Sequence, residues 1–206
     1  MVTEVRIYVE GGGDGKDGKA QVREGFSKFL IDLRNTARSK RIKWQIIACG
    51  PRNAAFRNFQ NALESHPDAF NVLLVDAENV VTATPFKHLH QQDGWHMSGI
   101  ADEQCHLMVQ LMESWLIADI ETLKRFYGQG FNAKPIPINP NVEDIPKQTV
   151  VSALRTATHN TTKGEYHKIR HSPRILAQLD VSKVRNAVPH CDRLFNTLAQ
   201  ELNTVI

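Results

Sequence analysis

A short apolar run at residues 71–75 constrains the fold of this chain more than any other segment. It reads NVLLV and is continuous rather than alternating. Such a run is typical of a central strand in a parallel sheet, because helices cover both faces of that kind of sheet. The run ends at Asp76. We therefore expect a buried central strand with an acidic side chain at its carboxyl end.

Further strands and helices are predicted on either side of this run. Apolar residues alternate or cluster as in strands at residues 4–10, 44–48 and 104–110, and they show helical spacing at residues 20–40, 53–64 and 111–127. Strands separated by helices predict βαβ units with right-handed crossovers. The expected fold class is therefore α/β: a Rossmann-like, mainly parallel sheet flanked by helices.

The last third of the chain predicts a different organisation. Residues 135–146 contain four prolines and predict a loop. Beyond them, helical segments are predicted at residues 149–157, 175–179 and 191–202. We expect a core at residues 1–134 that carries the chemistry, the proline-rich loop, and a helical carboxy-terminal extension at residues 147–206 packed on the core.

Bulk properties exclude several classes of protein. Cys49, Cys105 and Cys191 are odd in number and lack metal-finger spacing, which predicts buried thiols in a reducing compartment. The sequence has no signal-peptide pattern, and no apolar stretch approaches the roughly 18 residues of a membrane span. We expect a soluble cytoplasmic protein without membrane contact. A formal charge of +3 is too small to indicate a nucleic-acid partner by itself.

Acidic residues follow two of the predicted strands. Glu10 ends the first strand, and Asp76 and Glu78 follow the central run. Sheets of this kind bind ligands at the carboxyl ends of their strands. An extended backbone across Ala77 would point the carboxylates of Asp76 and Glu78 to the same side of the chain. Two carboxylates placed in this way can bind one cation such as Mg²⁺ or Mn²⁺. The alternative is that the segment DAEN opens a turn, as Asp and Asn often do.

The glycine-rich segment EGGGDGKDGKA at residues 10–20 matches both GxGxxG and GxxxxGK. A phosphate loop would need Ser or Thr where Ala20 stands, and Asp14 and Asp17 would place carboxylates where phosphates must lie. Nucleotide binding through Gly13–Lys19 therefore remains an alternative. The favoured interpretation is that the glycines allow close approach to Glu10.

Further candidate residues lie in the second half of the chain. Glu113 stands in an apolar stretch, where a lone carboxylate is costly to bury, so we predict a metal ligand; a surface position at a helix start is the alternative. Asp119 is predicted either to supply a further oxygen or to cap the next helix.

Basic candidates come from two segments. In KGEYHKIRH, Lys163 and Lys168 are predicted to contact phosphate and assist catalysis, Arg170 to contact phosphate, and His171 to donate a proton to a leaving oxygen. A solvated helix face explains these charges equally well.

The second basic segment follows Gly50-Pro51. Arg52 and Arg57 lie at a predicted helix start, where an anion can bind; capping by Asn53 is the alternative.

The order of these segments resembles a known group of proteins. The pair VEGGGDG and LLVDAEN resembles the TOPRIM fold of topoisomerases, primases and the nucleases of overcoming-lysogenization-defect type. With HLMVQLMESWLIAD, KGEYHKIRH and KVRNAVPHCDRLFNTL, the chain is similar to a TOPRIM-like family of unknown function that is commonly encoded beside an ABC- or AAA-type ATPase. The resemblance implies a TOPRIM-like sheet, acid or base chemistry at Glu10, and metal binding by Asp76 and Glu78.

The function expected from residues and resemblance together is a Mg²⁺- or Mn²⁺-dependent nuclease acting on DNA or RNA. It would be the effector of a bacterial anti-phage or toxin-like system with an ATPase partner, as a homodimer or in a larger complex. One position departs from the family pattern DxDxD, because Val80 stands at the third acidic position. Two alternatives therefore stay open: a non-catalytic binding subunit and a nucleotide-binding protein.

Overall fold

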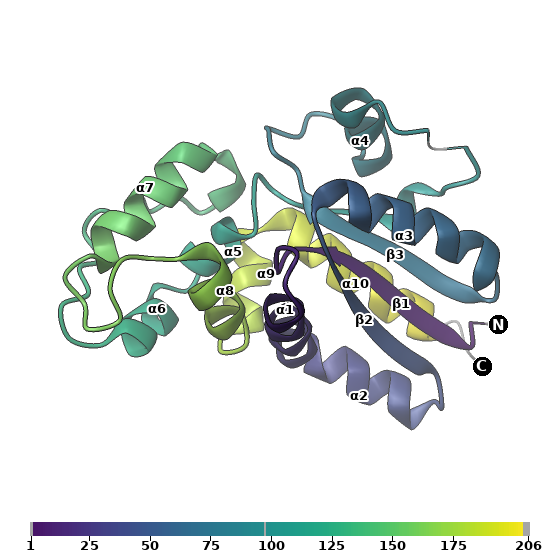
Figure 1. Cartoon of the computed structure of the whole chain (residues 1–206), viewed down its shortest axis with the longest axis horizontal. Helices are drawn as coiled ribbons and strands as arrows, with labels where there is room; N and C mark the ends of the chain where they lie inside the picture. Colours follow the sequence, from purple (N-terminus) through teal and green to yellow (C-terminus); the bar gives the residue numbers. More distant parts are fainter. Residues whose placement is uncertain (1, 97, 204–206) are drawn as a thin grey trace.

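The computed structural model describes residues 2–96 and 98–203 and has an α/β fold (Figure 1). Within these residues the sheet has four strands, all parallel, in the order β2-β1-β3-β4. The strands are β1 (Glu4–Glu10), β2 (Lys43–Gly50), β3 (Ala69–Asp76) and β4 (Cys105–Met108). Helices flank the sheet, which confirms the predicted Rossmann-like class.

The run at residues 71–75 lies in β3, between β1 and β4, as its composition predicts. Val72 and Leu74 pack into one hydrophobic cluster with residues of β1 and α1 (Lys16–Phe29). Leu73 and Val75 pack into a second cluster with residues of α3 (Arg52–Ser65). The run is continuous in sequence because alternate side chains fill separate cores on the two faces.

The remaining helices differ from prediction mainly in their boundaries. They are α2 (Ile31–Ser39), α4 (Pro85–Asp93), α5 (Glu113–Ile117), α6 (Ile120–Tyr127), α7 (Lys147–Thr158), α8 (Lys168–Leu176), α9 (Val181–Ala187) and α10 (Pro189–Asn203), with short 3₁₀ turns at residues 102–104 and 142–144. The single helices predicted at residues 20–40 and 111–127 are each divided in two. The predicted helix at residues 175–179 is wrong in its start, because α8 begins within KGEYHKIRH.

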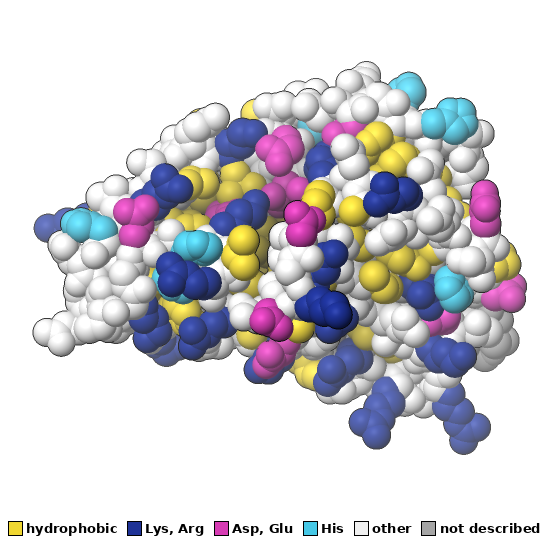
Figure 2. All heavy atoms as spheres, in the orientation of Figure 1, with side chains coloured by type: hydrophobic (Ala, Val, Ile, Leu, Met, Phe, Trp, Pro, Cys, Tyr) yellow, Lys and Arg dark blue, Asp and Glu magenta, His cyan; other side chains and the backbone are white. Residues whose placement is uncertain are grey.

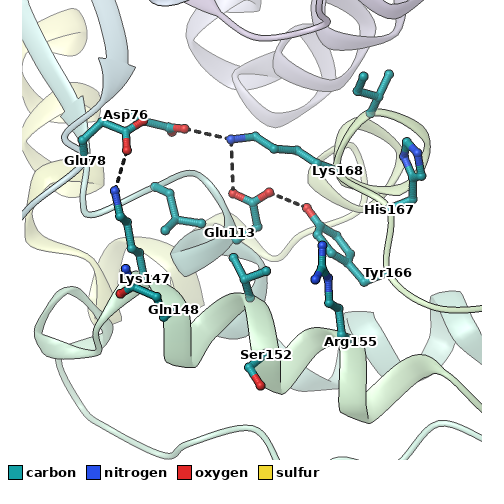
Figure 3. Close-up of a pocket in the computed structure, with 13 residues that line it drawn as sticks. Asp76, Glu78, Glu113, Lys147, Gln148, Ser152, Arg155, Tyr166, His167 and Lys168 are labelled. Atoms are coloured by element: carbon teal, nitrogen blue, oxygen red, sulfur yellow. Dashed lines mark hydrogen bonds and ion pairs between the residues drawn. The ribbon is translucent and has the colours of Figure 1, made fainter.

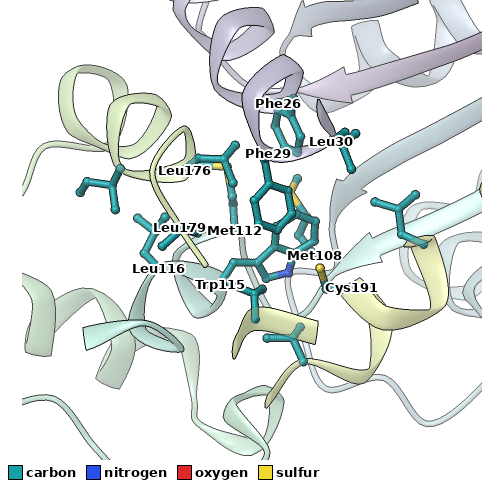
Figure 4. Packing of buried hydrophobic residues seen from close by; sticks show 14 of the residues in the cluster. Phe26, Phe29, Leu30, Met108, Met112, Trp115, Leu116, Leu176, Leu179 and Cys191 are labelled. Atoms are coloured by element: carbon teal, nitrogen blue, oxygen red, sulfur yellow. The ribbon is translucent and has the colours of Figure 1, made fainter. Parts of the chain in front are cut away.

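The carboxy-terminal helices share the main core. Trp115 of α5 is fully buried, and its ring lies 5.4 Å from that of Phe29, which also contacts Phe195 of α10 (Figure 4). The cluster continues from β1 through these rings to Leu202. All three cysteines are buried and unpaired, as predicted. None of the helices described has the length and apolar character needed to cross a membrane.

Candidate metal centre

Three carboxylates meet at the carboxyl edge of the sheet. Glu10 ends β1, Asp76 ends the neighbouring β3, and Glu78 follows two residues later. Each offers an oxygen, and the three oxygens lie within 4.8 Å of one another. Asp76 is 3% exposed, whereas the other two are partly exposed. The structure thus brings together the three acids predicted for a cation site.

Glu78 reaches this position by a turn and not by the extended backbone that the sequence suggested. Its φ is 67°, a left-handed conformation that is unfavourable for a residue with a side chain. Two backbone hydrogen bonds to β4 and the residues after it hold this turn. Ala77 N–H donates to Met108 O (2.9 Å), and Glu78 N–H donates to Gln110 O (2.8 Å). Strained backbone of this kind is often found at functional sites.

Asp76 is held by contacts on both carboxylate oxygens. Its Oδ1 accepts a hydrogen bond from Met112 N–H (2.8 Å), and its Oδ2 lies 3.0 Å from Lys168 Nζ. The Asp76 N–H donates to Glu10 Oε2 (3.1 Å). The end of β3 therefore orients the glutamate of β1 as well as its own carboxylate.

Arg52 has a different environment from the open anion site predicted for it. Its Nε and Nη2 each donate to Asp93 at 2.8 Å, and its Nη1 donates to Asp76 O and approaches Glu10 Oε2 at 3.4 Å. The guanidinium also lies 5.1 Å from the ring of Trp95. With most of its five N–H donors engaged, Arg52 positions Glu10 and the end of β3.

Neither Arg57 nor Asn53 has the environment suggested for it. Arg57 is exposed on α3 and lines neither of the cavities beside the carboxylates. Pro51 occupies the N-cap position of α3 without a side-chain hydrogen bond, and Asn53 lies inside the helix.

Glu113 is the first residue of α5 but is only 1% exposed, so the surface interpretation is wrong. Its Oε1 accepts a hydrogen bond from Tyr166 OH (2.7 Å). Its Oε2 has no hydrogen-bond partner among the described residues and lies 3.8 Å from Lys168 Nζ (Figure 3). Lys168 thus extends between Asp76 and Glu113.

Burial is the main influence on the pKa values of two acids at this site. Burial raises the pKa of Glu10 to about 7, with repulsion from Asp76 adding to it against the attraction of Arg52. Burial also raises the pKa of Glu113. Burial alone would lower the pKa of Lys168, but the attraction of Asp76 and Glu113 outweighs it and the net shift is upward. The raised pKa values show that the ionised form of these two acids is costly here, and either a proton or a nearby positive charge reduces that cost.

Lys147 also lies at the site, although no sequence pattern predicts it there. Its Nζ lies 2.7 Å from Glu78 Oε2, and its backbone N–H donates to Gln110 Oε1 (3.2 Å). It begins α7 directly after the proline-rich loop. No spacing pattern relates it to Glu78, 69 residues earlier.

Other predicted residues lie away from the carboxylates. Lys163 Nζ lies 5.4 Å from the Phe126 ring. His171 is 6% exposed, and its Nδ1 lies 3.0 Å from Tyr127 OH and 3.2 Å from His167 N. Arg170 is exposed on α8. None of these three candidates lines the cavities at the site.

The environment of His171 does not suit the role of proton donor. Burial, followed by the nearby charges of Arg170 and His167, lowers the pKa of this imidazole. The neutral form is therefore favoured, and its Nδ1 already has polar neighbours.

Asp119 acts as a helix cap rather than a member of the cluster. It accepts from Thr122 N–H at the start of α6 and pairs with Lys183 at 3.0 Å.

The glycine-rich loop packs against its own backbone. Gly11 and Gly50 exchange two backbone hydrogen bonds, of 2.9 and 3.1 Å. A Cβ on Gly18 would collide with Gly12 O, and a Cβ on Gly12 would lie 2.7 Å from Lys19 N. These contacts hold the loop against α1 and β2 directly after Glu10, in line with the interpretation that the glycines serve close approach.

Two cavities open beside the carboxylates. A cleft of about 830 Å³ extends from Asp76, Glu78 and Glu113 along α7. A smaller cavity of about 250 Å³ lies on the side of Glu10 and the glycine-rich loop. Asp76 and Lys168 line both. The space-filling view shows acidic side chains around an apolar hollow, with Lys and Arg nearby (Figure 2).

Comparison with known proteins identifies a family but no activity. A family model described as a domain of unknown function, DUF4276, matches residues 9–199. Because this match covers most of the chain, the protein belongs to the DUF4276 family. No curated protein and no solved structure matches the chain.

Proposed function

We propose that this DUF4276 protein is a divalent-metal-dependent nuclease that hydrolyses phosphodiester bonds of DNA or RNA. One observation carries the proposal: oxygens of Glu10, Asp76 and Glu78 lie within 4.8 Å of one another at the carboxyl ends of parallel strands. This edge is where such sheets bind their ligands. The resemblance of the surrounding segments to TOPRIM nucleases supports the same reaction class.

The donor set fits Mg²⁺ or Mn²⁺. All three groups are carboxylates, the ligands that hard cations prefer over the sulfur and nitrogen ligands typical of zinc. Asp76 and Glu78 would hold the ion with Glu10, and the buried Glu113 Oε2 is a further oxygen without a hydrogen-bond partner in the described chain. When bound, the ion would polarise a phosphoryl oxygen and make bound water more acidic.

The side chains have distinct roles in this proposal. Glu10, oriented by Asp76 N–H and Arg52, accepts a proton from the attacking water. Burial raises the pKa of Glu10 in the absence of a cation, and a cation bound beside it would lower that pKa and leave the carboxylate ionised to accept the proton. The water oxygen bonds to phosphorus as the bond to the leaving oxygen breaks, and solvent protonates that oxygen. Lys168 and Lys147 neutralise charge on the phosphoryl group.

Cleavage assays test the proposal directly. Plasmid DNA, single-stranded DNA and tRNA are incubated with Mg²⁺ or Mn²⁺ and with wild type, Glu10→Gln or Asp76→Asn. We expect cation-dependent cleavage by wild type and a loss of about 100-fold or more in each variant. Asp68→Asn, which alters an exposed acid directly before the start of β3, is the matched control and should cleave as wild type does. Equal cleavage by all four proteins would exclude a catalytic role for these carboxylates.

A non-catalytic binding subunit is the second candidate. Val80, which stands where a third acid occurs in many TOPRIM enzymes, is 61% exposed and offers no ligand atom. If the protein binds nucleic acid but never cleaves it, this candidate replaces the first.

The biological setting is proposed from the resemblance alone. A cytoplasmic defence or toxin-like complex with an ABC- or AAA-type ATPase would fit a nuclease that must be restrained. Co-expression with an ABC- or AAA-type ATPase encoded beside the protein, followed by size-exclusion chromatography, tests both that partner and self-association.

A further inference from the structure

The cleft beside the carboxylates is much larger than a cation and its water require. Its volume of about 830 Å³ lies within the roughly 300–1,000 Å³ of sites that enclose a small organic ligand. A cavity that holds one water molecule needs only about 10–15 Å³. The cleft therefore has room for a sizeable part of a substrate.

The walls of the cleft are largely apolar. Leu111, Val151 and Ile169 line it, and Ile169 is 46% exposed. Among the described residues, only Val80 and Ile138 are large hydrophobic side chains of comparable exposure. An exposed isoleucine beside a charged centre provides a surface for the flat face of a base.

Positive charge stands at both ends of these walls. Lys147 and Lys168 lie at the carboxylate end, and Arg155 lines the cleft farther along α7. Arg155 pairs with Glu165 at 3.3 Å, but both side chains are more than half exposed. Such exposed pairs contribute little, so Arg155 can exchange this partner for a phosphate.

A buried acceptor also faces the cleft. Glu113 is 1% exposed and lines it, and its Oε2 has no hydrogen-bond partner within the described residues. Figure 3 shows this carboxylate between Tyr166 and Lys168, on the same side as Asp76. Lys168 Nζ is a charged neighbour of Glu113 Oε2 at 3.8 Å, beyond hydrogen-bond distance, so a ligand or ion at this oxygen would reduce the cost of burying it.

We propose that the cleft binds one unpaired nucleotide of a single-stranded nucleic acid. Its base lies on Leu111, Val151 and Ile169, its phosphodiester lies at the carboxylates, and Arg155 holds the next phosphate. The proposal rests on the proposed nuclease function and names its substrate class. Bases paired inside a duplex cannot enter a cleft of this kind without leaving the stack.

Fluorescence anisotropy tests this proposal by measuring binding in Mg²⁺. The probe is a short fluorescein-labelled oligo(dT) or oligo(U) with phosphorothioate linkages. Val151→Trp fills the cleft and should weaken binding about tenfold or more, and Ile169→Ala, which removes apolar contact area, about fivefold. Ile138→Ala, an equally apolar but 92% exposed site outside the cleft, is the matched control and should bind as wild type does. A duplex should bind more weakly than either strand.

Salt dependence tests the role of Arg155 separately. Arg155→Gln should reduce the slope of log affinity against log salt by about 0.7, the value for one phosphate contact to a single strand. Arg34→Gln, an exposed arginine on α2, should leave the slope unchanged.

The two proposals fail in different ways. Wild-type affinity in Val151→Trp, or equal affinity for duplex and strand, would overturn the cleft proposal whatever the cleavage assay shows. A protein that binds strands as expected but shows no effect of Glu10→Gln on cleavage would overturn the nuclease proposal alone. Thermal unfolding of each variant confirms that it is folded.

Discussion

Lys168 Nζ lies 3.0 Å from Asp76 Oδ2, a carboxylate oxygen of the proposed cation site. The same ammonium is 3.8 Å from Glu113 Oε2. The Lys168 ammonium thus neutralises part of the charge of these buried acids, and a cation bound to Asp76 as proposed above would compete with it.

Removing this competing charge should separate metal binding from cleavage. In Lys168→Met we expect Mn²⁺ to bind several-fold more tightly, because no ammonium has to leave Asp76, while cleavage becomes slower. Isothermal titration with Mn²⁺ and the cleavage assay provide the two measurements. Lys163→Met, which alters a lysine of the same segment that contacts Phe126, is the control. Weaker Mn²⁺ binding in Lys168→Met would contradict the competition.

The hydrogen bond between Tyr166 and Glu113 should stabilise the fold. Among the described residues, Tyr166 is the one whose side chain donates a hydrogen bond to the Glu113 carboxylate. Tyr166→Phe removes this bond and should lower the free energy of unfolding by about 1–3 kcal/mol. Urea unfolding measures the loss. Glu113→Gln and the double variant complete a mutant cycle, and strictly additive losses would show that the two groups are not coupled.

Packing of the glycine-rich loop predicts a contrast between two glycines of the same segment. Gly18→Ala places a methyl group against Gly12 O, so we expect a loss of at least about 2 kcal/mol in stability or failure to fold. Gly15→Ala meets nothing within 4 Å and should cost less than about 1 kcal/mol as a cap substitution. Thermal unfolding compares the two, and similar losses would contradict the close packing.

His106 should make the protein less stable in mild acid. Burial, followed by the charge of Arg193, lowers the pKa of His106 from 6.5 to about 3. Between these values the unfolded chain binds a proton that the folded chain does not. Stability is therefore complete above pH 6.5 and falls by up to about 1.4 kcal/mol per pH unit as the pH decreases toward 3.

Urea unfolding between neutral pH and pH 5 measures this dependence. His106→Gln removes the titrating group and should flatten the profile. His159→Gln, which replaces an exposed histidine, should follow the wild-type profile. A wild-type slope retained in His106→Gln would assign the acid sensitivity to other groups.

The strands and three of the carboxylates were predictable because their signals are local. A continuous run ending in an acid, such as that of β3, reports burial on both faces and a position at the sheet edge at once. The positions of charged segments were predicted less well. The start of α8 in KGEYHKIRH was missed because its basic residues show no apolar periodicity. The pairing of Lys147 with Glu78 depends on how the proline-rich loop returns the chain, which no local pattern encodes.

Polar roles were harder to predict than positions. Arg52 was correctly placed at a strand end, but its engagement by Asp93 depends on α4, an element that the sequence did not reveal. His171 shares a segment with Lys168, yet one helical turn puts its ring among aromatic side chains instead of at the acids.

Alternate side chains of β3 enter two separate hydrophobic clusters, and this arrangement has a mechanical consequence for the carboxylate at its end. The strand packs against a different hydrophobic cluster on each face, so two clusters together fix the position of Asp76. Weaker packing in either cluster would let the end of β3, and with it the Asp76 carboxylate, move. Substitutions at Leu74 and Val75, on opposite faces of the sheet, should therefore both displace the Asp76 carboxylate, although neither residue lines the cavities beside it.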